Sequence, residues 1–163
     1  MKTVNRICQI LAIVLGIGSV VLFFLRFATI TSSGSDVSLV GAQLGFGSKI
    51  TAAGTEYRMA KSSDILFCFL LTVLSAVFGT LSFKSKKLRY FAPAVGIIDA
   101  VYMLVIALSN PNKFVDARPL PDVTAISYTP FVLVTAIALF AFTASAVAYL
   151  LIDDYIEVKE SNG

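Results

Sequence analysis

The amino-acid sequence contains no histidine and no tryptophan, and only two of its 163 residues are cysteines. The absence of histidine excludes histidine general bases, histidine metal ligands and Ser-His-Asp triads. Cys8 and Cys68 stand far apart, so they form neither a CxxC redox motif nor a zinc signature. We therefore expect a non-enzymatic protein with no cofactor and no metal site.

Charged residues are also scarce. They make up 14% of the chain, against 57% apolar residues, and the mean hydropathy is +0.85. A soluble domain of this composition would lack the polar surface needed to cover itself, so the lipid bilayer is the expected solvent. The net charge of +3 is small and dispersed, which disfavours nucleic acid as a partner.

Four apolar runs are long enough to cross a bilayer core, which takes about 20 helical residues. They are 7–25, 65–83, 91–108 and 128–152. The sequence therefore predicts an all-α membrane protein, a four-transmembrane-helix bundle that forms one integral domain over residues 1–163. We interpret the first run as a retained span rather than a signal peptide, because it is longer than a usual h-region and no A-x-A pattern follows it.

Lysine and arginine predict the orientation of the spans. Lys2 and Arg6 precede the first span, and the short link 84–90 between the second and third spans carries Lys84, Lys86, Lys87 and Arg89. The loops 26–64 and 109–127 carry as many cations, but dispersed among acidic residues. By the positive-inside rule we expect both termini and the tail 153–163 in the cytoplasm of a cell whose plasma membrane holds the chain. The basic link also attracts anionic headgroups.

The first outer loop, 26–64, contains the stretch DVSLVGAQLGFGSKIT, which mixes β-forming residues with glycine turns. We expect a hairpin there, within a two- or three-stranded extracellular cap, although a flexible Ser/Gly-rich loop stays an alternative. The second outer loop, 109–127, is stiffened by prolines and is expected to pack against the first. Arg26 and Asp64, at the borders of the first loop, either pair or extend separately into water.

Small residues recur at four-residue spacing in the spans, which favours close helix packing in lipid. We interpret them as the core of the bundle before an oligomer interface. The residues are Ala12 and Gly16, Ser75 and Gly79, and Ala92, Gly96 and Ala100.

Asp99 is the only charged residue within the run 91–108, and it lies near the midplane, ten residues or about 15 Å from Arg89. A charge there costs about 2.5–3.5 kcal/mol, so the side chain is expected to face the bundle interior. Two interpretations stay open: a neutral interhelical hydrogen bond, or a proton or cation site. The candidate polar site comprises Asp99, Tyr102, Ser75, Ser19 and Thr143.

The inside termini, the larger glycine-containing loop after the first span and the smaller loop after the third together resemble the layout of claudin-type four-span proteins. The claudin W-G-L-W signature and its two loop cysteines are absent. The chain is also similar to small four-span proteins of Gram-positive bacteria, with the G-x-Q-L-x-F-G stretch at Gly41–Gly47. The resemblance implies a multi-pass layout and assigns no activity.

Three functions remain in order of preference. The first is a non-enzymatic scaffold or accessory subunit that contacts another membrane protein through its outer loops. The second is a homo-oligomeric channel or transporter subunit, in which Asp99 serves as a proton or cation site. The third is an intramembrane enzyme, which has little support because Asp99 has no obvious catalytic partner in the spans.

Overall fold

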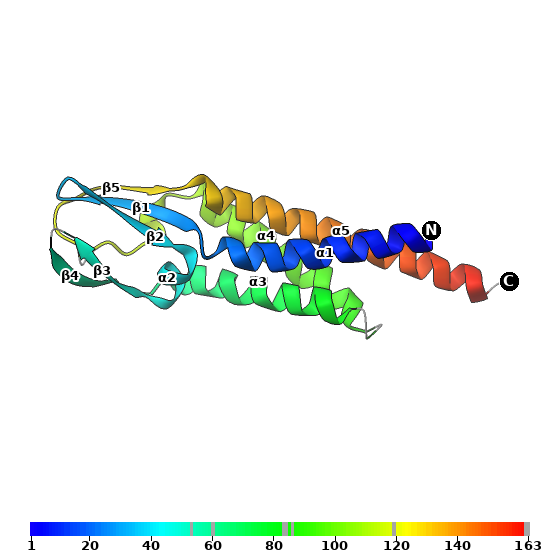
Figure 1. Cartoon of the computed structure of the whole chain (residues 1–163). Helices are drawn as coiled ribbons and strands as arrows, with labels where there is room; N and C mark the ends of the chain where they lie inside the picture. The colour runs from blue at the N-terminus through cyan, green and yellow to red at the C-terminus, as the bar shows by residue number, and fades with distance from the viewer. Residues whose placement is uncertain (53, 60, 83–84, 86, 119, 162–163) are drawn as a thin grey trace. The chain divides into compact units, whose positions relative to one another are not determined.

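A computed structural model describes residues 1–52, 54–59, 61–82, 85, 87–118 and 120–161 (Figure 1). Long helices alternate with short strands, and two 3₁₀ turns adjoin α4. The elements in chain order are α1 (Lys2–Leu22), β1 (Arg26–Ser32), β2 (Ser35–Val40), α2 (Gly41–Phe46), β3 (Ser48–Ala52), β4 (Thr55–Met59), α3 (Ser63–Leu81), η1 (Leu88–Tyr90), α4 (Phe91–Leu108), η2 (Pro111–Lys113), β5 (Val123–Tyr128) and α5 (Pro130–Ser161).

Four helices, α1, α3, α4 and α5, are long and apolar enough to cross a membrane, in agreement with the predicted four-span layout. The helix α4 begins and ends at the residues expected for the third span. The helix α1 begins at Lys2 and ends at Leu22, earlier than expected at both ends, because the chain enters β1 at Arg26. The helix α5 continues to Ser161, through the acidic stretch that we expected to be a separate tail.

The chain forms two compact units. The helical unit comprises Met1–Val20, Leu71–Ala100 and Ile137–Gly163 as far as these are described, and the sheet unit comprises Val21–Leu70 and Val101–Ala136. The boundaries fall inside the continuous helices α1, α3, α4 and α5. Each unit is described separately below.

The helical unit is centred on Phe142 of α5, whose side chain is fully buried. Ala12 and Ala92 belong to the same buried cluster. Glycines from three helices face the ring so closely that an added Cβ would lie 3.4 Å from it at Gly16, 3.0 Å at Gly79 and 2.7 Å at Gly96. Small residues of α1, α3 and α4 therefore form a socket for one large aromatic side chain. Close packing of this kind favours helix association in lipid, where the hydrophobic effect does not drive it.

The sheet unit contains a three-stranded antiparallel sheet in the order β2-β1-β5 and a separate β3-β4 hairpin. The β1-β2 connection is a two-residue turn at Ser33 and Gly34, with φ of 48° and 74°, the positive values that a tight hairpin turn requires. The small β-structure expected within residues 26–64 is present. Its second strand runs from Ser35 to Val40 and pairs back with β1.

The stretch Gly41–Phe46, which we expected to belong to a hairpin, forms the short helix α2 instead. The side-chain carbonyl of Gln43 accepts a 3.1 Å hydrogen bond from the backbone N–H of Val40, which stabilises the first turn. Gly41 and Gly45 contact their neighbours closely: an added Cβ would lie 2.9 Å from Phe27 and 3.2 Å from the Leu66 backbone. The glycines therefore permit close packing of a helical turn rather than a strand reversal.

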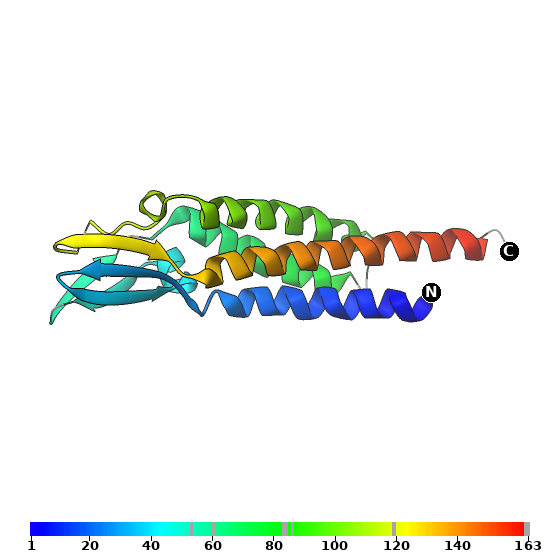
Figure 2. The same cartoon turned by 90° about the horizontal axis from the view of Figure 1, so that it is seen from above.

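The second outer loop joins the sheet through β5, which pairs antiparallel with β1 from Ala28↔Tyr128 to Ser32↔Val123 (Figure 2). The backbone carbonyl of Pro121 accepts a hydrogen bond from the buried Ser32 hydroxyl. Alternate residues of β1 are buried, including Ala28 and Ile30, both 0% exposed. The strand β1 is thus the centre of one sheet built from both outer loops.

Candidate functional site

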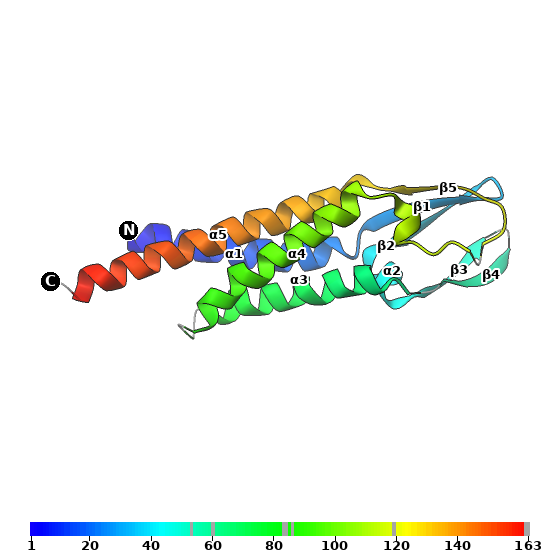
Figure 3. The same ribbon diagram turned by 180° about the vertical axis from the view of Figure 1, so that it is seen from behind.

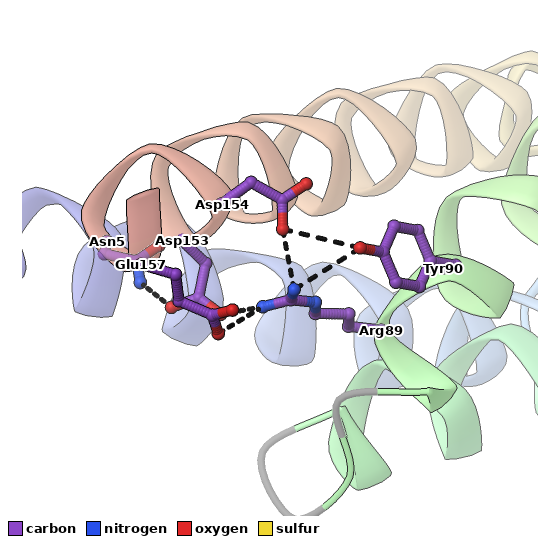
Figure 4. Close-up of polar contacts among 6 residues, drawn as sticks. All are labelled: Asn5, Arg89, Tyr90, Asp153, Asp154 and Glu157. Atoms are coloured by element: carbon purple, nitrogen blue, oxygen red, sulfur yellow. Dashed lines mark hydrogen bonds and ion pairs between the residues drawn. The ribbon is translucent and has the colours of Figure 1, made fainter. Parts of the chain in front are cut away.

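Arg89 lies just before α4, and its side chain is only 5% exposed. Its Nη1 is paired with Asp153 and lies 3.2 Å from Glu157 Oε1, while Nη2 lies 2.6 Å from Asp154 Oδ1 (Figure 4). Nη2 also donates a 3.3 Å hydrogen bond to the Tyr90 hydroxyl. Three carboxylates of α5 therefore surround one guanidinium, whose planar fork suits such multiple pairing.

The helical continuation of α5 makes this cluster possible, because residues 153, 154 and 157 then lie within little more than one turn. The helix α1 joins the cluster where Asn5 Nδ2 donates a 3.0 Å hydrogen bond to Asp153 Oδ1. Farther along, Lys2 pairs with Glu160 at 2.8 Å, although both side chains are largely exposed. The ends of α1 and α5 are thereby tied together, and both termini of the chain lie at this end of the helical unit (Figure 1).

The basic link was predicted to attract anionic headgroups. Its two described cations, Lys87 and Arg89, lie in different surroundings. Arg89 is buried among carboxylates, so its guanidinium is not available to a lipid surface. Lys87 is exposed. Lys84 and Lys86 lie outside the described residues.

Asp99 is fully buried in the helical unit, and α3 provides its partner. Thr72 Oγ1 donates a 2.7 Å hydrogen bond to Asp99 Oδ2, where α3 and α4 run side by side (Figure 3). Asp99 Oδ1 and the hydroxyl of Ser75, one turn from Thr72, are buried with no hydrogen-bond partner among the described residues. Unsatisfied buried polar atoms are rare and costly, so these two atoms mark a candidate functional site in the helical unit.

The other members of the predicted polar site do not converge on Asp99. Ser19 and Thr143 are buried, but each donates to a carbonyl of its own helix, Leu15 at 2.8 Å and Leu139 at 2.9 Å. Such bonds satisfy the hydroxyl locally. In the sheet unit, the Tyr102 hydroxyl donates to Asp64 Oδ1, and its ring lies edge-on to Phe67 at 5.8 Å between centroids.

The prediction for Asp99 missed Thr72, although the helix lengths contain a signal for it. Thr72 lies nine residues after the first residue of α3, and Asp99 lies nine residues before the last residue of α4. Antiparallel neighbours of equal rise place these two residues at one level. Ser75, which we chose from a count along the predicted span, lies one turn away from that level.

A cavity of about 560 Å³ opens in the sheet unit between the start of α3, the second outer loop and β5. Its polar lining includes Asp64 and Asp116. Arg118 donates to Asp116 from both Nε and Nη2, each at 2.9 Å, and these bonds lower the pKa of the Asp116 carboxyl below its ordinary value. The sequence placed no binding site here because the lining residues come from separate segments.

No protein family model matches this chain, and neither a curated protein nor a solved structure matches it. A function is therefore proposed from the contacts and burial of these residues. Three features stand out: the Arg89 cluster, the Asp99–Thr72 contact and the cavity beside β5.

Proposed function

We propose that the chain is a multi-pass plasma-membrane protein with both termini in the cytoplasm, and that it acts without catalysis as a scaffold or accessory subunit of a membrane complex. The orientation is supported by the density of lysine and arginine around residues 2–6 and 84–89. In this placement the helices α1, α3, α4 and α5 cross the bilayer and the strands β1 to β5 lie outside it.

The observation that carries the proposal is the position of β1 between β2 and β5. Two loops about a hundred residues apart in sequence converge into one sheet, which costs conformational entropy and fixes a surface of defined shape. The strands β2 and β5 are the edge strands of this sheet, so each has one backbone edge that no strand of the sheet pairs with. Exposed edges are templates for strand addition by a partner. We infer that a second membrane protein is recognised at this sheet.

The test is native mass spectrometry of the detergent-extracted protein from its own host, without overexpression. We expect a heteromeric complex, and we expect Ala125→Lys to weaken it, because Ala125 is exposed on the edge strand β5 and a lysine there blocks strand pairing. Thr55→Lys is the matched control, since Thr55 is exposed on the separate β3-β4 hairpin. A complex that survives Ala125→Lys, or a chain that is recovered only with copies of itself, contradicts the proposal.

The runner-up function is a homo-oligomeric channel or transporter subunit, and one observation favours it. Asp99 Oδ1 is buried without a hydrogen-bond partner among the described residues, which suits a group that takes up a proton or a cation. Ion flux in reconstituted vesicles that is lost in Asp99→Asn, at normal expression, would support this function. Absence of flux in the wild type would leave Asp99 as a structural hydrogen-bonding group.

A further inference from the structure

The cavity in the sheet unit has the volume of a small-molecule site, about 560 Å³. Its walls come from residues 61–64 at the start of α3, from residues 112–118 and Leu120, and from β5. Because the apolar part of α3 begins at Ile65, the proposed membrane placement puts the cavity mouth at the level of the lipid headgroups. The inference below rests on that placement, but not on the proposed partner.

The charged side chains on the cavity wall differ in whether they have a polar partner within the chain. Asp116 is paired with Arg118, and Asp64 accepts a hydrogen bond from the Tyr102 hydroxyl. Lys61 and Lys113, which come from two separate segments, are exposed and form no ion pair with a described carboxylate. Two ammonium groups are therefore left for an anion.

The rest of the wall divides into a polar and an apolar part. Ser62 and Ser63, which follow Lys61 in the chain, also line the cavity, and a serine hydroxyl can act as a neutral hydrogen-bond donor. Phe114, Val123 and Ile126 line the apolar part. A lining of this kind suits a ligand that carries an anionic group at one end and hydrocarbon at the other.

We infer that this cavity binds the phosphate group of an anionic phospholipid, with Lys61 and Lys113 contacting the phosphate and the apolar wall contacting the glycerol and first acyl carbons. A phosphodiester shares its negative charge between two non-bridging oxygens, so two ammonium groups from different segments can contact it at once. A soluble phosphate ester shares this chemistry, but it leaves the apolar wall unused.

The experiment measures lipid binding to the purified full-length chain by native mass spectrometry in detergent. The probes are phosphatidylglycerol, phosphatidylcholine and glycerol 3-phosphate. We expect phosphatidylglycerol to bind best, because the choline ammonium offsets the phosphate charge. We expect Lys61→Gln combined with Lys113→Gln to weaken phosphatidylglycerol binding on the order of tenfold, as befits the loss of charged hydrogen bonds.

Arg26→Gln is the matched control, because Arg26 is an exposed cation of the sheet unit that does not line the cavity. It should change phosphatidylglycerol binding less than twofold. Equal losses in Arg26→Gln and the double variant would indicate general surface attraction and overturn the inference, as would full binding by the double variant. Glycerol 3-phosphate binding as tight as the lipid, and lost in the double variant, would uphold the phosphate site and identify a soluble ester as the ligand.

Discussion

Thr72 donates a 2.7 Å hydrogen bond to Asp99, and both side chains are fully buried in the helical unit. The described parts of the four apolar helices hold no lysine or arginine near the middle of their spans, so a hydroxyl rather than a cation supports this carboxyl group. The contact links α3 to α4 at one defined level.

Thr72→Val should destabilise the helical unit, because it leaves Asp99 Oδ2 without a donor. Interhelical hydrogen bonds in membranes are worth about 0.6 kcal/mol on average and about 1.7 at most. Because the variant also leaves a buried acceptor unsatisfied, we expect a loss of about 1–2 kcal/mol in the free energy of unfolding. Equilibrium unfolding in detergent micelles measures it. Thr80→Val is the control on the same helix, since the exposed Thr80 only donates to its own Ala76 carbonyl at 2.8 Å.

Asp99→Asn should keep the Thr72 contact, because the amide still offers an oxygen acceptor. We expect the free energy of unfolding to change by less than about 0.5 kcal/mol if the carboxyl group serves structure alone. Flux assays on the same variant give the independent readout. A stable Asp99→Asn variant without flux, beside a conducting wild type, would move the assignment to transport.

Arg89→Gln should loosen the end of α5, because Asp153, Asp154 and Glu157 then repel one another. Removing one partner of a buried ion pair typically costs about 3–5 kcal/mol, and we expect about 2–3 here, because the carboxylates keep 25–42% of their side-chain surface and can be hydrated. Hydrogen exchange over residues 153–161 should accelerate.

The matched control for this change is Lys87→Gln, which removes an equal charge from an exposed side chain of the same link. It should leave exchange in α5 unchanged. Equal effects of the two variants would mean that net charge, rather than the buried cluster, orders the end of α5.

Gly96→Ala should disturb the socket around Phe142. The added Cβ would lie 2.7 Å from both the Phe142 ring and the Thr143 hydroxyl, so α4 or α5 must shift, at a cost of about 1–3 kcal/mol. At Gly18, an added Cβ meets nothing within 4 Å. Gly18→Ala should therefore stabilise α1 by about 0.5 kcal/mol, and thermal melting of the two variants should shift in opposite directions.

The Asp116–Arg118 pair gives a prediction for acid pH. Hydrogen bonds from Arg118 lower the pKa of Asp116 in the folded state, so the pair contributes stability above the unfolded pKa of about 3.9 and loses it as pH falls through the lower folded value. A carboxyl-carbon NMR titration should give a midpoint below about 3.9. Arg118→Gln should raise that midpoint, and an unchanged midpoint would contradict the assigned cause.

Sequence reasoning predicted the features that depend on composition. It failed where the local structure involves contacts with residues that are distant in the sequence. Long apolar runs identify spans by themselves, and 91–108 is helical over the whole predicted range. The residues after 152 are acidic, and in the structure they continue α5 and pair with Arg89, some sixty residues earlier. The segment Gly41–Phe46 has strand-like neighbours, and in the structure it is a helix in close contact with Phe27 and Leu66.

The site residues divide in the same way. The burial of Asp99 could be predicted from the sequence, because a charge in a long apolar run would be costly in lipid. To predict its partner Thr72, one must know which residues of α3 and α4 lie at the same level. The predicted range of α3 was shifted by two residues, so it gave the wrong level. The packing glycines were recognisable by spacing, but their common target, Phe142, was not, because spacing alone does not say which side chain fills the space.

The pairing of β1 with both β2 and β5 has a consequence for the biogenesis of the protein. The hairpin partner β2 follows β1 immediately, whereas β5 is synthesised about a hundred residues later. At ribosomal rates of about 5–20 residues per second, the far edge of β1 stays open for roughly 5–20 seconds while the long helices α3 and α4 are synthesised. During that interval the nascent hairpin is exposed to wrong strand pairing, and the sheet is completed only after β5 has been synthesised.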